Sequence, residues 1–124
     1  MKTFTLNCHP GMCWRIRAVI HPTRAALRRH RGQINPKGKP HAIEGFFHEW
    51  PEAMWKNHII GEIHLFRQTS QATVIHEAAH AAIWLCCIIK LDLNHTWGYE
   101  TFAQIVEHIA DGTLHGLKMD FRRK

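Results

Sequence analysis

The sequence has no apolar run as long as the roughly twenty residues that a helix needs to cross a membrane. Its longest candidate, residues 78–89, is shorter and is interrupted by His80. The first residues also lack the apolar segment and small-residue cleavage site of a secretory signal peptide. Neither an internal repeat nor a low-complexity segment is present. We therefore expect a cytoplasmic protein without membrane contact.

Cysteine is scarce, with 4 residues in 124. Because disulfides are rare in intracellular proteins, we expect free thiols. Cys8 and Cys13, with His9 beside them, have the composition of half a metal knuckle, but no second Cys/His pair follows at finger-like spacing. Cys86 and Cys87 are adjacent on a predicted helix and are interpreted as core residues. The role of Cys8 and Cys13 stays open.

Acidic residues are also few, since 10 Asp and Glu stand against 16 Lys and Arg, a net charge of +6. Part of the excess lies in two clusters, residues 24–31 and 122–124. A charge of this size is typical of a solvated surface, which we favour. It also permits contact with nucleic acid or with an acidic protein, although no nucleic-acid-binding motif accompanies it.

The chain is long enough for one domain with its own core, and its 45% hydrophobic and 21% charged residues are ordinary for a folded protein. Alternating apolar residues predict three strands, and helical spacing predicts three helices. The last two helices are hydrophobic, which predicts an α+β fold with both packed on one face of a small three-stranded sheet. The predicted strands are residues 14–20, 42–50 and 58–66, and the predicted helices are about 21–31, 70–90 and 97–110. The single domain, 1–124, would also have an irregular lead-in, 1–13, a loop, 32–40, and a loosely held basic tail, 113–124.

Residues 69–97 contain neither Gly nor Pro. They include the pattern His-Glu-Ala-Ala-His at 76–80. On a helix, residues i and i+4 share a face, so His76 and His80 can bind one zinc ion. Glu77 then lies beside the metal, where a carboxylate can take a proton from metal-bound water. The alternative is an amphipathic core helix with two histidines at its rim. We favour a site for one Zn²⁺ ion with Glu77 as the general base.

A catalytic zinc takes three protein ligands and leaves one position for water. Glu100 is our first choice for the third ligand, because it lies in the first turn of a helix that must return along the motif helix. The small Ala103, one turn later, would let that helix approach the metal. The alternatives, in order, are Glu107 and then His95 or His108.

A His-Glu-x-x-His helix followed about twenty residues later by a helix with a Glu resembles the gluzincin metallopeptidases. Residues 61–65, 74–82 and 100–107 are similar to small phage- and plasmid-borne zincins, so the likeness covers about residues 58–112. It implies a minimal zincin-like fold, one Zn²⁺ ion and hydrolysis of peptide bonds, in the host cytoplasm if the gene belongs to a phage. The chain departs from larger gluzincins at Gln104, where those enzymes often have an Asp that supports a ligand.

The resemblance further implies that the strand before the motif helix borders the cleft. The free edge of Gly61, Glu62, Ile63 and His64 would then pair with an extended peptide or protein substrate. For His64 itself we favour an exposed strand position. A donor to the developing oxyanion is expected from Tyr99, His95 or His108.

A second hypothesis keeps the zincin scaffold but not the catalysis. The protein would be a binding protein, such as a phage-encoded inhibitor or a binder of nucleic acid or acidic proteins through its basic surface. The small size of the domain leaves little room for substrate subsites, which favours a protein partner or a flexible substrate segment. Replacement of Glu77 by Gln discriminates the two hypotheses, because only a hydrolase needs the carboxylate.

Overall fold

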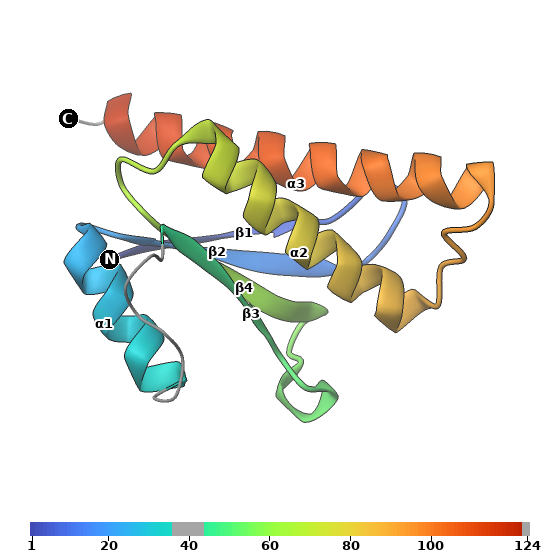
Figure 1. Cartoon of the computed structure of the whole chain (residues 1–124), viewed down its shortest axis with the longest axis horizontal. Helices are drawn as coiled ribbons and strands as arrows, with labels where there is room; N and C mark the ends of the chain where they lie inside the picture. The colour runs from blue at the N-terminus through green and yellow to red at the C-terminus, as the bar shows by residue number, and fades with distance from the viewer. Residues whose placement is uncertain (36–43, 123–124) are drawn as a thin grey trace.

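The structure is a computed structural model that describes residues 1–35 and 44–122, with side chains described up to residue 118. The predicted loop 32–40 and tail 113–124 fall partly outside these residues. A four-stranded mixed sheet in the order β1-β2-β4-β3 has α2 and α3 on one face and α1 against the other (Figure 1). The strands are β1 (Lys2–Asn7), β2 (Arg15–His21), β3 (Gly45–Glu49) and β4 (Ile59–Phe66). The helices are α1 (Arg24–Ile34), the 3-10 turn η1 (Glu52–Met54), α2 (Gln71–Ile89) and α3 (Thr96–Arg122).

The α+β class and the placement of two helices on one face are confirmed, but the sheet has four strands instead of three. The additional strand is β1, which lies in the predicted irregular lead-in and pairs with β2 in antiparallel orientation. Phe4 and Leu6 alternate with exposed threonines and pack against the main core, a pattern typical of a half-buried strand. The prediction overlooked this short alternation because Pro10 and Gly11 follow it closely.

Helix α3 is longer than predicted, since Gly112 does not end it. Instead, Gly112 lies against Leu6, and Gly116 lies close to the ring of Phe4. A side chain at Gly116 would overlap the Phe4 ring, so glycine at this position lets α3 approach β1 closely. The Thr113 hydroxyl donates a hydrogen bond to the Ile109 carbonyl within the same helix. The segment predicted as a loose tail is thus helical to residue 122, because β1 supplies a surface for it.

Helix α2 begins with a capped N-terminus, where the Ser70 side chain accepts a hydrogen bond from the backbone of Thr73. It ends at Lys90, which has a left-handed backbone with φ of 56° and returns a hydrogen bond to Cys86. By length and composition α2 could also cross a membrane. However, it packs against β3, β4 and α3, and the core helix of a soluble protein passes the same test. Its buried face is formed by Val74, Glu77, Ala78, Ala81, Ala82, Leu85 and Cys86.

Helix α1 covers part of the other face of the sheet. Its Thr23 cap accepts a hydrogen bond from the backbone of Ala26, and Leu27 packs against Phe46 and Phe66. The helix continues beyond Gly32, where a stop was predicted, to Ile34. Strands β2, β3 and β4 otherwise match the predicted strands within a few residues.

Candidate metal centre

The first half of α2 presents two histidine rings side by side. His76 and His80 are exposed, and their Nε2 atoms lie 3.2 Å apart. Two imidazole nitrogens on one tetrahedral zinc, each about 2.0–2.1 Å from the ion, would be roughly 3.3–3.4 Å apart. The same separation also permits one ring to donate a hydrogen bond to the other. The pair is thus spaced for a shared zinc ion without movement of the helix.

Glu77 lies between these histidines but points toward the protein interior. It is only 5% exposed, and its carboxylate lies within 4.8 Å of a nitrogen of each ring. Burial raises the pKa of Glu77, while His76 and His80 act in the opposite direction. A buried carboxyl group with a raised pKa beside a metal position has the properties of a general base.

A cavity of about 300 Å³ opens beside these three residues. It lies between α2 and β3, the edge strand of the sheet, and Arg31 of α1 reaches it from the other side of that edge. Its lining residues are Arg31, Gly45, Phe46, Phe47, Glu49, His76, Glu77 and His80. A backbone edge and a candidate metal position therefore border the same space.

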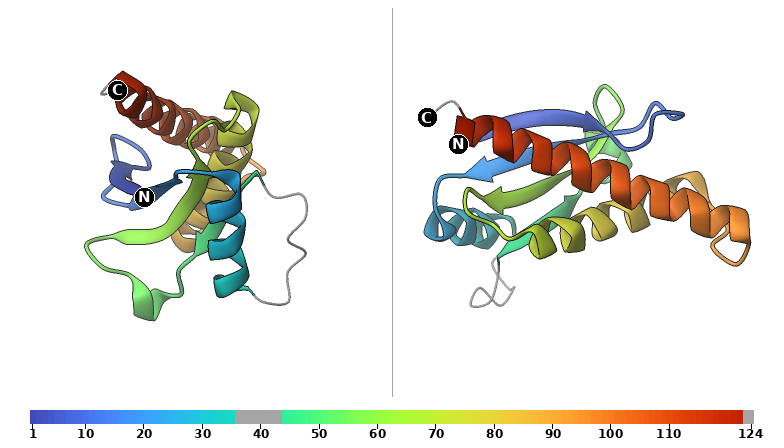
Figure 2. Two further views of the ribbon diagram at one scale, coloured as in Figure 1. Left: turned by 90° about the vertical axis from the view of Figure 1, so that its left-hand side faces the viewer. Right: turned by 90° about the horizontal axis from the view of Figure 1, so that it is seen from above.

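Glu100, the predicted third ligand, is not brought to this cavity. It is exposed in the first turn of α3, and neither the histidine cluster nor the cavity lining includes a residue of α3. Helix α3 runs back along α2, so its beginning lies beside the end of α2 (Figures 1 and 2). From His80 to Ile89 the helix rises by about 14 Å at 1.5 Å per residue. This length separates Glu100 from the histidine pair.

The other predicted candidates also lie on or near α3. Tyr99 is 57% exposed, and His95 pairs with Asp92 in the turn before the helix. Glu107 and His108 are exposed beside a different cavity, which His9 and Gln104 also line. None of the predicted alternatives lines the cavity at α2.

Two residues of the cavity, Glu49 and Arg31, were missed by the sequence analysis. A signal for Glu49 was present, because alternation within the predicted strand 42–50 places Gly45, Phe47 and Glu49 on one face. Arg31 had no such signal, since its position depends on how α1 crosses the sheet.

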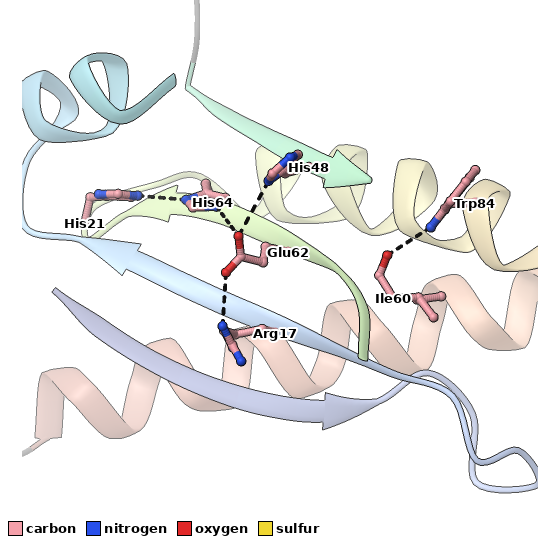
Figure 3. A network of polar contacts seen from close by, with 7 residues as sticks. All are labelled: Arg17, His21, His48, Ile60, Glu62, His64 and Trp84. Carbon is pink, nitrogen blue, oxygen red and sulfur yellow. Dashed lines mark hydrogen bonds and ion pairs between the residues drawn. The ribbon is translucent and has the colours of Figure 1, made fainter. Parts of the chain in front are cut away.

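The prediction that β4 offers a free edge to substrate is wrong. Strand β4 is hydrogen-bonded to β2 on one side and to β3 on the other, so the exposed edge belongs to β3. Gly61 instead packs beneath Phe47, and Ile63 is fully buried in the core. Glu62 and His64 point to the same face of the sheet (Figure 3), where the His64 ring stacks on His30 of α1, and neither residue lines the cavity at α2.

On that face Glu62 is the centre of a polar network (Figure 3). It contacts Arg17, His48 and His64, and His64 in turn is hydrogen-bonded to His21 at 2.9 Å. Burial opposes ionisation of Glu62, but the hydrogen bond from His64 and the charges of His64, Arg17 and His48 lower its pKa to about 2. Burial also lowers the pKa of His64, and that of His21 to about 4. His64 is 1% exposed, so the exposed position favoured from sequence is wrong.

The cysteines are all free thiols. Cys8 is fully buried in the main core, whereas Cys13 is exposed. Among the described residues, neither belongs to a cluster of three metal-binding side chains. Cys86 is buried as expected, but Cys87 is exposed because the two adjacent side chains point in different directions from α2.

Comparisons with known proteins found no match among protein-family models, curated proteins or solved structures. The resemblance to the zincins therefore rests on the sequence motifs alone.

Proposed function

We propose that this chain is a zinc-dependent peptidase with its centre at His76, Glu77 and His80. The observation that carries the proposal is the pair of imidazole nitrogens 3.2 Å apart, with the buried Glu77 beside them at the mouth of a cavity. When bound, zinc would lower the pKa of its water and polarise a carbonyl group. Glu77 would accept the proton of that water and deliver it to the leaving amine.

The edge strand β3 is the proposed binding surface for substrate. Its Gly45, Phe46 and Phe47 line the cavity, and its outer edge is free of any strand among the described residues. An extended peptide can add to such an edge through main-chain hydrogen bonds. This replaces β4 with β3 in the role that the sequence analysis assigned. Arg31 adds a positive charge at the same cavity, where it can pair with a carboxylate of the substrate.

We further propose Glu49 as the third zinc ligand in place of Glu100. Besides Glu77, it is the acidic side chain that lines the cavity with His76 and His80. It comes from β3, on the opposite side of the cavity from α2. We expect Glu49→Gln to weaken zinc binding at least about tenfold, because a catalytic zinc needs three protein ligands. Glu100→Gln should leave binding unchanged. Competition with a chelating dye would measure the zinc affinity of both variants. Weaker binding by Glu100→Gln with unchanged binding by Glu49→Gln would identify Glu100 as the third ligand instead.

The peptidase proposal is tested by hydrolysis of fluorescein-labelled casein and of a mixed library of quenched peptides. The zinc-loaded wild type should cleave an unfolded chain, and Glu77→Gln should lose at least about 100-fold in rate while its zinc content is unchanged. Glu52→Gln, an exposed substitution in η1, is the matched control and should keep full activity.

Two results would contradict this function. Hydrolysis that survives Glu77→Gln would show that another group activates the water. Zinc binding by the wild type without hydrolysis of any substrate would favour the non-catalytic binding protein on the same scaffold.

A further inference from the structure

A second group of metal-binding side chains lies on the face of the sheet opposite α2. His48 comes from β3, and Glu62 and His64 come from β4 (Figure 3). Glu62 Oε1 lies 3.2 Å from His64 Nε2 and 3.7 Å from His48 Nδ1, and the three ligand atoms are all within 4.8 Å of one another. Ligand atoms on one tetrahedral zinc would be about 3.3–3.4 Å apart. Small side-chain adjustments would therefore bring all three onto one ion.

One nitrogen of the His48 imidazole faces Glu62 without forming a hydrogen bond to it. Its Nδ1 atom is buried and makes no hydrogen bond within the described part of the chain. The 3.7 Å to Glu62 is too long for a hydrogen bond. Buried polar atoms in folded proteins almost always have a partner, so this nitrogen points to a ligand.

The ring of His64 is held in the orientation that a metal ligand needs. It is stacked between Phe46, at 4.4 Å, and His30, at 4.7 Å. Its Nδ1 atom is hydrogen-bonded to His21, which leaves Nε2 directed at Glu62. Metal-binding histidines are typically fixed in this way through their second ring nitrogen.

We propose that His48, Glu62 and His64 form a second zinc site. Two imidazoles and one carboxylate are a donor set that zinc prefers, and a fourth position would remain for water. The ion can enter from solvent, because the His48 side chain is 26% exposed and that of Glu62 is 15% exposed.

The bound ion would join the edge strand β3 to β4. The next residues of β3 on either side of His48 are Phe47 and Glu49, which point to the other face and line the cavity at α2. A metal ion at the second site would therefore fix β3, the strand that lines the cavity at α2. This site does not depend on the proposed peptidase, since the two groups share no ligand.

The test uses the full chain with zinc alone as the probe, in a His76→Ala/His80→Ala background that removes the site on α2. Both substitutions are on an exposed helix face, where Ala is favourable. By calorimetric titration and metal analysis we expect about two equivalents of zinc in the wild type and about one in this background. Addition of His48→Gln should remove the remaining equivalent, whereas the exposed His115→Gln should not.

A second measurement does not require a substitution at the site itself. In the His76→Ala/His80→Ala background, zinc should shift the ring-nitrogen NMR resonances of His48 and His64 and raise the thermal midpoint by at least about 5 °C. No zinc in that background, or zinc that survives His48→Gln, would overturn the second site. A wild type that shows no hydrolysis, or no zinc at the α2 site, would leave the second site unaffected. The two proposals therefore fail separately.

Discussion

The four cysteine side chains differ sharply in accessibility, and this difference gives a test at the scale of single residues. Burial raises the pKa of Cys8 to about 12, and burial together with Cys87 raises the pKa of Cys86. Cys13 and Cys87 are exposed. Because the thiolate is the reactive form, only the exposed pair should react readily.

We therefore expect iodoacetamide at pH 8 to modify Cys13 and Cys87 in the native protein and all four cysteines after unfolding in guanidinium. Mass spectrometry of proteolytic peptides measures each position. Modification of Cys8 as fast as Cys13 would contradict the buried position of Cys8. If Cys8 and Cys13 both reacted without metal and added zinc protected both, the result would support the metal knuckle that the sequence left open.

At the scale of elements, the contact between β3 and β4 depends on Gly61. A side chain at this position would place its Cβ 2.6 Å from the ring of Phe47 and 2.7 Å from the backbone oxygen of His48. The backbone oxygen cannot move without displacement of β3. The close approach of the two strands, and with it the position of His48 over Glu62, therefore requires glycine.

Gly61→Ala should lower the free energy of unfolding by about 1–3 kcal/mol, as overpacking usually does. The matched control is Gly32→Ala in α1, where an added Cβ meets no atom within 4 Å. It should raise the free energy of unfolding by about 0.5–1 kcal/mol, since Ala is favoured over Gly in a helix. Urea unfolding monitored by circular dichroism measures both. Equal stability of Gly61→Ala and wild type would contradict the close packing of β3.

The elements that could be predicted are those whose signals are local. Helix α2 is specified by its Ser70 cap and by apolar periodicity, and the spacing of His76 and His80 within it fixes their geometry. Strand β1 and the second half of α3 could not be predicted as easily, because each depends on the other. Phe4 packs against α3 where Gly116 leaves room for its ring, and Leu6 packs against Gly112 one turn earlier.

At the scale of the whole molecule, the two groups of histidine and glutamate side chains could be predicted from the sequence only where their spacing is local. The pair on α2 is four residues apart and visible in the sequence, but its surroundings depend on the length of α2 and on the order of the strands. These place Glu49 at the cavity and Glu100 away from it. The group of His48, Glu62 and His64 requires the β3–β4 register, in which His48 pairs with Glu62. No sequence spacing reveals such a register.

The two groups lie on opposite sides of one sheet. Strand β3 lines the cavity beside the first group and supplies His48 to the second. Phe47 and Glu49 of this strand line the cavity at α2, and His48 between them belongs to the polar network around Glu62. The two candidate metal sites that we propose each contain two histidines.

The metal centre on α2 is measured most directly by zinc titration of the variant His48→Gln/Glu62→Gln, in which only that site remains. We expect about one equivalent of zinc in this variant and its loss on addition of His76→Ala. Absence of zinc from the variant while it stays folded, or binding that His76→Ala leaves unchanged, would contradict a metal centre on α2 and with it the proposed peptidase.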